Sequence, residues 1–271
     1  MQVRYCDIHS HIHDHQFDAD RGEVLARMKE ARVATIAIGT DYDSSARAVA
    51  LAEREENVFS AIGRHPNDNR TEVFDDAAYR ALASHERVVA IGECGLDYYW
   101  PAHHNWNEGG EVAEKRRQRD LFERQIAFSG TAGKPLMIHG RPTKGSMDAY
   151  EDILEILAAY PDVVGNVHFF VGDTNIAHRF VDRGFTMSFT GVLTFTHDYD
   201  ETVRYLPRES IMAETDSPYV APVPHRGARN EPVYVIETVK TIARIRNEQE
   251  DAVRNALMEN VRRVFGTFLT F

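Results

Sequence analysis

Six side chains of the types that bind divalent metal ions stand at the ends of short apolar segments of this chain. They are His9, His11, Glu93, His139, His168 and Asp216. Apolar runs such as residues 88–91 are typical of strands buried on both faces, as in a parallel sheet covered by helices. Polar side chains that follow such strands meet at one mouth of a barrel. The pattern therefore predicts a metal-dependent hydrolytic site assembled from several strands.

The first two histidines belong to a longer alternating series. Residues two apart in a strand point the same way, so His9 and His11 can hold one ion. The series continues through His13 and His15, which are equally typical of a solvated loop. Asp7 is open to two interpretations, because it can support a metal-bound imidazole or serve as a structural cap inside the barrel.

The remaining candidates complete a second ion site and a catalytic group. Glu93 can bridge two ions because its carboxylate has two oxygens, and His139 and His168 would complete the second ion. Asp216 could bind the first ion and accept a proton from an attacking water whose pKa an ion lowers to roughly 7. The alternatives are a core carboxylate neutralised by an arginine for Glu93, a hydrogen-bonded core residue for each histidine, and a turn for residues 216–218.

Eight strand–helix units can be traced along the chain. The strands are predicted over residues 3–8, 35–39, 58–62, 88–92, 135–138, 163–167, 186–189 and 210–213, and the helices over 21–31, 44–55, 75–84, 114–127, 146–159, 175–183, 199–206 and 233–246. A further helix is predicted over 249–264. Alternating strands and helices imply a parallel sheet, and eight units favour an α/β TIM (β/α)8 barrel with an extra C-terminal helix over an open doubly wound sheet.

Composition narrows the class of protein. The 271 residues contain no linker-like segment, so a single barrel domain over residues 1–271 is expected. The net charge of −11 argues against broad nucleic-acid binding, although a nucleotide end could still enter a small metal-containing cleft. Two isolated cysteines and the lack of an apolar span predict a cytoplasmic protein without membrane contact.

Seven segments, taken in order, resemble the TatD-type metal-dependent deoxyribonucleases of the amidohydrolase-like superfamily. The segments are residues 7–11 (DIHSH), 63–66 (GRHP), 92–98 (GECGLDY), 139–141 (HGR), 168–172 (HFFVG), 214–219 (ETDSPY) and 226–232 (RGARNEP). The resemblance runs from about residue 3 to residue 265. It implies a TIM-barrel metallohydrolase that cuts phosphodiester bonds, in several members as a 3′-to-5′ exonuclease acting on DNA or nucleotide ends.

The resemblance also implies roles for individual residues. It assigns His9, His11, Glu93 and Asp216 to one ion, and Glu93, His139 and His168 to the other. His65 and Arg141 correspond to positions on the substrate side. An arginine can pair with a phosphate through two hydrogen bonds, and the alternative for Arg141 is a surface ion pair. The two ions are expected to be Mg²⁺, Mn²⁺ or Zn²⁺, and four imidazoles favour a softer ion than magnesium.

Three departures from the family pattern bear on the substrate. His13 stands where an acidic or small polar residue is usual, residues 169–171 read Phe-Phe-Val in place of a more typical Cys-Phe-Ser, and the loop from residue 100 to about 115 is long. Within residues 100–110 and just before them, Tyr98, Trp100 and Trp106 could stack on bases or equally pack on the rim or a partner subunit.

Two other functions compete with phosphodiester cleavage. The same metal site could hydrolyse an ester or amide, as in an aminoacyl-tRNA deacylase or a lactonase. A noncatalytic binding protein on a barrel fold is the third possibility. The retention of all six ligand types argues against it, because loss of catalysis would be expected to remove at least one of them.

Overall fold

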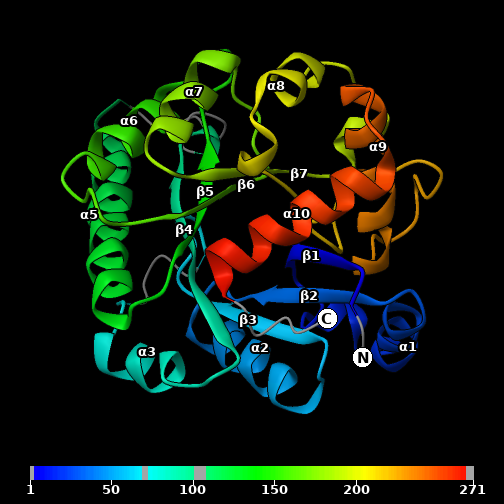
Figure 1. The fold of residues 1–271 in the computed structure, drawn as a ribbon. Helices are drawn as coiled ribbons and strands as arrows, with labels where there is room; N and C mark the ends of the chain where they lie inside the picture. Colours follow the sequence, from blue (N-terminus) through cyan, green and yellow to red (C-terminus); the bar gives the residue numbers. More distant parts are fainter. Residues whose placement is uncertain (1–2, 69–72, 101–107, 267–271) are drawn as a thin grey trace.

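The computed structural model describes residues 3–68, 73–100 and 108–266, and it confirms the predicted barrel. Eight parallel strands follow one another around a single sheet in the order β1 to β8. They are β1 (Tyr5–Ser10), β2 (Val33–Ile38), β3 (Val58–Ile62), β4 (Val88–Asp97), β5 (Leu136–Arg141), β6 (Gly165–His168), β7 (Thr186–Phe189) and β8 (Ile211–Ala213). Figure 1 shows helices surrounding this sheet, which is the arrangement of a TIM barrel.

The helices occupy nearly all of the predicted ranges. They are α1 (Arg21–Glu30), α2 (Tyr42–Arg54), α3 (Asp76–Ala83), α5 (Glu108–Ala132), α6 (Asp148–Leu157), α7 (Thr174–Asp182), α8 (Asp200–Tyr205), α9 (Val235–Arg246) and α10 (Glu250–Phe265). Short 3-10 turns are η1 (His15–Phe17), η2 (Gly191–Thr194), η3 (Arg208–Ser210) and η4 (Pro232–Tyr234). No helix within the described part of the chain is long and apolar enough to cross a membrane.

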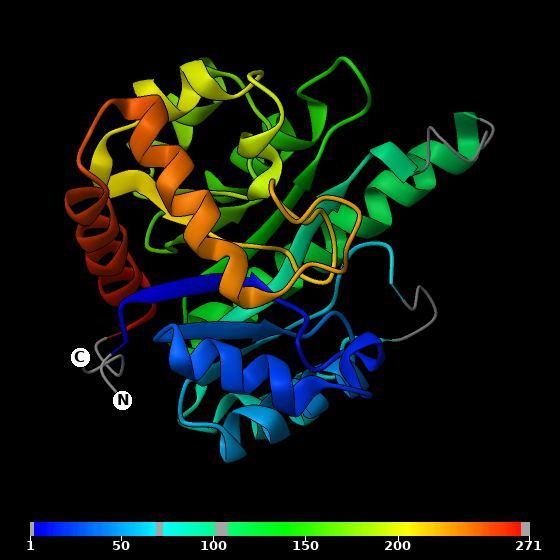
Figure 2. The ribbon, with the colours of Figure 1, turned by 90° about the vertical axis from the view of Figure 1, so that its right-hand side faces the viewer.

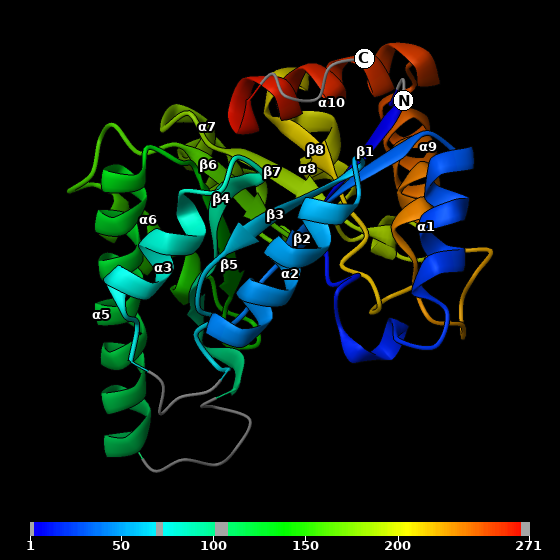
Figure 3. The same cartoon turned by 90° about the horizontal axis from the view of Figure 1, so that it is seen from below.

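The extra C-terminal helix closes one end of the barrel. Met258, Val261 and Phe265 on α10 belong to the same buried cluster as the interior side chains Ile8 and Met212. Figure 2 shows α10 beside β1, and Figure 3 shows it across one end of the barrel, with the chain that follows β1 at the other end. Because α10 covers the amino ends of the strands, the opposite mouth is left for a site built at their carboxyl ends.

The barrel is joined between β1 and the segment after β8 by residues next to the candidate ligands. The backbone N–H of Asp216 donates to the carbonyl of His9 at 2.9 Å, and the N–H of His11 donates to the carbonyl of Ser217 at 2.7 Å. Ser10 and Ser217 form a parallel bridge. The seam of the barrel therefore fixes the relative positions of the two segments that carry His9, His11 and Asp216.

Two predicted boundaries were wrong in a way that matters for the site. The fourth strand continues to Asp97 instead of ending at Gly92, because the buried residues 94–97 go on pairing with β5. Glu93 therefore lies inside its strand, and so does His139, because β5 runs to Arg141 and not only to residue 138 as predicted. The long α5 begins at Glu108, so residues 108–110 are helical and do not belong to the predicted loop. Glycines commonly weaken strands, which is why the sequence pattern stopped at Gly92.

Gly95 is required where β4 passes β5, and replacing it with alanine is expected to destabilise the fold. Its φ of +138° is rarely adopted by other residues, and an added Cβ would overlap the carbonyl oxygen of His139. The expected loss is roughly 1–3 kcal/mol or more, measured by chemical denaturation. Gly130→Ala in α5 is the matched control, because its Cβ would meet open space and alanine favours helix. Equal stability of the two variants would contradict this role of Gly95.

Candidate metal centre

The structure brings all six predicted ligands together at the carboxyl ends of the strands. His9 lies on β1, Glu93 on β4, His139 on β5 and His168 on β6, whereas His11 and Asp216 follow β1 and β8. Five of them line one cavity of about 770 Å³. The sixth, His9, is fully buried beside them. The six predicted ligands, which come from separate segments of the chain, therefore do meet at one end of the barrel.

One set of ligand atoms gathers around one oxygen of Glu93. Oε2 of Glu93 lies 3.4 Å from Nε2 of His9 and 3.9 Å from Nε2 of His11. Oδ1 of Asp216 lies 3.7 Å and 3.5 Å from the same two nitrogens. Ligands bound at about 2.1 Å in a tetrahedron stand about 3.4 Å apart, so this set is close to the spacing that one ion requires.

A second set gathers around the other oxygen of the same carboxylate. Oε1 of Glu93 lies 2.8 Å from Nδ1 of His139 and 2.8 Å from Nε2 of His168. The two nitrogens are 3.2 Å apart. Since Oε1 and Oε2 face different sets, Glu93 stands between two candidate ion positions.

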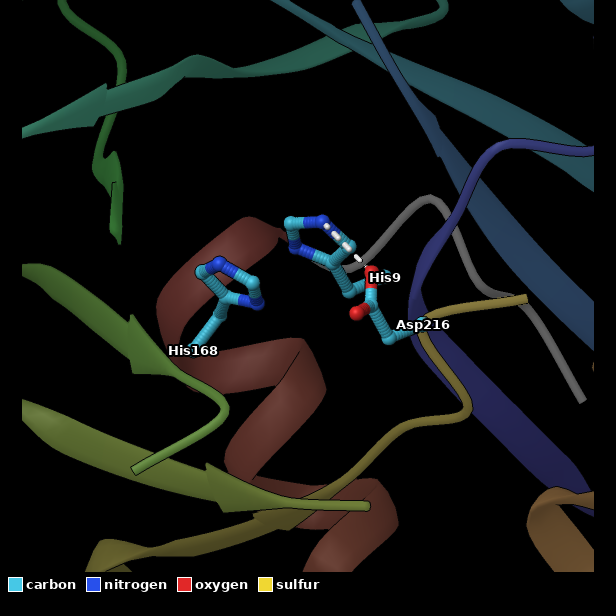
Figure 4. A group of neighbouring side chains, drawn as sticks. All are labelled: His9, His168 and Asp216. Atoms are coloured by element: carbon cyan, nitrogen blue, oxygen red, sulfur yellow. Dashed lines mark ion pairs between the residues drawn. The ribbon is translucent and has the colours of Figure 1, made fainter. Parts of the chain in front are cut away.

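The environment of His9 fits a bound cation. Its side chain is fully buried, yet neither ring nitrogen has a hydrogen-bond partner within the described residues. Its ring stacks on that of His168, with 3.8 Å between ring centroids and an angle of 11° between planes. Figure 4 shows the His9 ring between His168 and Asp216. A buried imidazole without partners is costly, and an ion on Nε2 would satisfy one of its two nitrogens.

The buried charges of the cluster favour one another. Burial alone would raise the pKa of Glu93, but His168, His65 and His9 hold it well below its usual value. Burial lowers the pKa of His139, whereas the carboxylates of Asp97 and Glu93 more than offset this and raise it to about 9. The carboxylates are therefore ionised at neutral pH, which is the form that binds a cation.

Comparison of the sequence with known proteins also points to a metal-dependent enzyme. A family model described as "TatD related DNase" matches residues 6–266. The chain belongs to this family. The Bacillus subtilis protein YabD, named a metal-dependent hydrolase, is 34% identical over 265 residues, covering 96% of this chain and 98% of YabD. A Cronobacter sakazakii relative named "3'-5' ssDNA/RNA exonuclease TatD" is 31% identical over 271 residues, covering 96% of this chain and 97% of that protein.

The solved structures show the same fold. YjjV, a TatD homologue from Escherichia coli K12, matches with a TM-score of 0.85 and 25% identity, covering 98% of this chain and 99% of YjjV. The predicted family is therefore confirmed, and this TatD-family protein is a metal-dependent hydrolase.

Two carboxylates that the sequence analysis did not single out support the histidines of this TatD-family site. Oδ2 of Asp97 lies 3.3 Å from Nε2 of His139, the nitrogen that faces away from Glu93. Oε1 of Glu214 lies 3.5 Å from Nδ1 of His168. A carboxylate on the outer nitrogen orients a metal-binding imidazole. In the sequence Asp97 lies four residues after Glu93 and Glu214 two before Asp216, but this spacing does not show which histidine each carboxylate contacts.

His65 and Asp97 also form a potential three-ligand group with His139. In the arrangement found here, His139 already turns Nδ1 toward Glu93 at 2.8 Å. With an ion on Nδ1, the neutral imidazole would carry its proton on Nε2 and donate it to Asp97. The group is therefore better explained as support for the second set than as a third ion site.

The structure decides between the alternative interpretations of three residues near the start of the chain. Asp7 is fully buried and accepts hydrogen bonds from the backbone N–H and the hydroxyl of Thr215, at 2.8 Å and 2.6 Å. It thus ties β1 to the segment after β8 as a structural cap and forms no hydrogen bond with the ring of His9. His13 is buried, with Nε2 3.0 Å from the hydroxyl of Ser44, whereas the exposed His15 pairs with Asp18. Only His15 fits the solvated-loop interpretation.

The predicted substrate-side residues both line the cavity. Nε2 of His65 lies 3.6 Å from Oε1 of Glu93, close to the second ligand set. The guanidinium of Arg141 lies 4.0 Å from the centre of the Tyr99 ring and 5.9 Å from that of Trp100. Arg141 forms no ion pair with a described residue, so the structure does not favour the surface-pair alternative. Stacking on Tyr99 holds the guanidinium beside the cavity.

The aromatic residues in and next to the predicted loop differ in their exposure. Tyr98 is 1% exposed and donates its hydroxyl hydrogen to Asp152 at 2.7 Å, so of its two open alternatives it packs within the protein and is not available to stack on a base. Its position inside the strand–helix junction explains this burial. Trp100 is 36% exposed and lines the cavity, which keeps it available to a substrate. Trp106 lies outside the described residues.

Proposed function

We propose that this TatD-family hydrolase cleaves phosphodiester bonds with two divalent ions, and acts as a 3′-to-5′ exonuclease on DNA. The observation that carries the proposal is the division of Glu93 between two ligand sets, one with Oε2 and one with Oε1. Two ions a few ångströms apart stabilise the attacking and leaving oxygens of an in-line displacement at phosphorus. The name of the Cronobacter relative, a 3'-5' exonuclease, supports the same type of bond and the same direction of cleavage.

The donor set fits divalent ions. His9, His11, Glu93 and Asp216 would hold one ion, and Glu93, His139 and His168 the other. Imidazole and carboxylate donors suit Zn²⁺ and Mn²⁺, and Mg²⁺ would bind through the carboxylates with retained waters. When bound, the ions supply Lewis acidity and lower the pKa of an attacking water.

Asp216 is suited to accept the proton of that attacking water. Burial would raise its pKa, but hydrogen bonding to His11 and the charges of His9 and His11 lower it below its usual value. Its backbone has a φ of 56°, a left-handed conformation that few residues other than glycine adopt. Such conformations persist where the surroundings fix them, and they cluster at functional sites. The ionised carboxylate is thus held in one place beside the first ligand set.

Arg141 would bind the phosphate of the substrate. Among the described residues that line the cavity it is the one arginine, and no lysine joins it. Its planar guanidinium can donate two parallel hydrogen bonds to a phosphate. His65, next to the second ligand set, would contact the same group. An anionic substrate is therefore drawn to the side of the cavity formed by β5.

The site should require a free end and few phosphate contacts. A chain of net charge −11 offers little attraction to a long nucleic acid, and Arg141 supplies a single lining cation. Each phosphate neutralised on a single strand contributes about −0.7 to the slope of log affinity against log salt. Contacts to one to three phosphates therefore predict a slope between about −0.7 and −2 for kcat/KM on single-stranded DNA. A steep slope, or rapid cutting of closed circular DNA, would contradict end-directed cleavage.

The bond class can be tested with two chromogenic substrates. Protein supplied with Mn²⁺ should hydrolyse bis-p-nitrophenyl phosphate in preference to p-nitrophenyl acetate, and chelation with EDTA should abolish the phosphodiesterase activity. Loss of activity in Asp216→Asn controls for a contaminating nuclease. Hydrolysis of the acetate alone would replace this proposal with the esterase or amidase alternative, which includes aminoacyl-tRNA deacylation.

A further inference from the structure

One side of the cavity is apolar, and we infer that it is the subsite for the base of the nucleotide whose phosphate binds at Arg141. Four side chains form this apolar wall: Phe169, Val171, Val192 and Tyr199. They follow β6, lie on η2 and precede α8, so one sector of the barrel supplies all four. Each is only partly buried and offers surface to the cavity. The inference rests on the proposed phosphodiesterase function and specifies which part of the substrate the enzyme recognises.

The wall is held in place by the residue at its centre. Phe170 is 1% exposed, and its ring packs with those of Tyr150, Phe180 and Phe189. Its backbone N–H donates to the carbonyl of Ser188 at 2.9 Å. With Phe170 anchored in the core, the residues on either side of it stay at the cavity surface. The apolar surface is therefore built into the fold.

Phe169 places the start of the wall beside the metal centre. Its backbone N–H donates to the buried carboxylate of Glu214 at 2.6 Å, and its φ is 45°. Its ring lies edge-on to that of His168, with 6.4 Å between centroids. Next in the chain, the N–H of Val171 donates to the hydroxyl oxygen of Tyr150 at 3.1 Å. A group bound on the wall would thus lie next to the second ligand set.

The rest of the cavity has a different chemical character. Asp14, Asp68, His13 and Ser44 line the opposite part, and they would repel or hydrate an apolar group. Arg141 lies on β5, the strand before the wall. A nucleotide presents one anionic group and one flat apolar group, which matches a cation followed by an apolar wall. The sugar is too polar to account for this surface, so the base is the fitting occupant.

The inference predicts that the base contributes to binding even without turnover. Thymidine 5′-monophosphate and 2-deoxyribose 5-phosphate share a phosphate and a sugar and differ by the base. In calorimetric titrations of protein supplied with Mn²⁺, we expect the nucleotide to bind at least about tenfold more tightly, because stacking of one base on an aromatic ring is worth roughly that factor or more. Competitive inhibition of bis-p-nitrophenyl phosphate hydrolysis should give the same ratio.

Substitutions in the wall should reduce that ratio while leaving binding of the sugar phosphate unchanged. Val171→Thr and Val192→Thr keep the side-chain shape and replace one methyl group by a hydroxyl. Phe169→Asn removes the ring with a residue that tolerates a left-handed backbone. Each should lower the ratio by about threefold or more. Phe195→Asn is the matched control, since this 44% exposed ring lies under Arg226 and does not line the cavity.

The outcomes separate this inference from the proposed function. Equal binding of the two phosphates by the unaltered protein would overturn the inference, and so would a ratio that no wall substitution lowers, even if diesters are hydrolysed. A tenfold ratio that falls in the wall variants and persists in Phe195→Asn would support it. If that pattern appeared without any diester hydrolysis, the base subsite would stand and the phosphodiesterase proposal would fall.

Discussion

Glu93→Gln is expected to lower phosphodiesterase activity by at least about 10³-fold, because one residue serves both ion positions. The carboxylate oxygens lie 3.4 Å from Nε2 of His9 and 2.8 Å from Nδ1 of His139. Glutamine keeps the size of the side chain but removes the charge and turns an NH₂ group toward one ligand set. Loss of several kcal/mol of transition-state stabilisation corresponds to that rate factor. The measurement is kcat with bis-p-nitrophenyl phosphate, with metal content determined on the same sample.

The control for this variant is Glu23→Gln on α1, whose side chain is 78% exposed and does not line the cavity. It should retain full activity and full metal content. If Glu93→Gln instead bound as many ions as the unaltered protein and turned over at a similar rate, Glu93 would not bridge two sites.

Asp216→Asn is expected to lower kcat by about 10²–10⁴-fold, the usual contribution of a general base, while substrate binding is largely retained. The amide cannot accept the proton of the attacking water. Asparagine tolerates the left-handed backbone that this position adopts, with φ at 56°, so the fold should persist. Circular dichroism checks the fold, and the comparison is made at matched metal content.

His168→Ala provides a second comparison for the same account. The His168→Ala substitution should also lower kcat strongly, because it removes a histidine of the second ligand set. The Asp216→Asn substitution leaves that set intact. Activity close to that of the unaltered protein in either variant, with metal content matched, would refute the assigned roles.

Most of the architecture could be predicted because buried parallel strands produce continuous apolar runs. The segments around Val58–Ile62 and Thr186–Phe189 were located to the residue. The boundary of β4 could not be, because Gly92 and Gly95 interrupt the apolar pattern while the strand continues in contact with β5. Whether a strand continues past a glycine depends on the neighbouring strand with which it pairs, and the sequence around the glycine does not reveal that neighbour.

In the candidate site, too, residues could be predicted from their neighbours in the sequence, but contacts between distant segments could not. The six ligand types could be predicted because each follows or ends an apolar run. The roles of Asp97 and Glu214 could not, since each depends on a histidine supplied by another strand. Asp7 likewise had two open interpretations until its pairing with Thr215, 208 residues away, was known. The burial of Tyr98 likewise depends on its hydrogen-bond partner on α6, which the sequence around Tyr98 does not reveal.

The most direct test of the two-ion account is anomalous diffraction from crystals of the protein grown with Mn²⁺ or Zn²⁺, recorded at the absorption edge of the metal. The account predicts two peaks about 3.5–4 Å apart, one near Nε2 of His9 and one near Nδ1 of His139, with the carboxylate of Glu93 between them. A single peak at full occupancy, or two peaks that share no contact with Glu93, would contradict it.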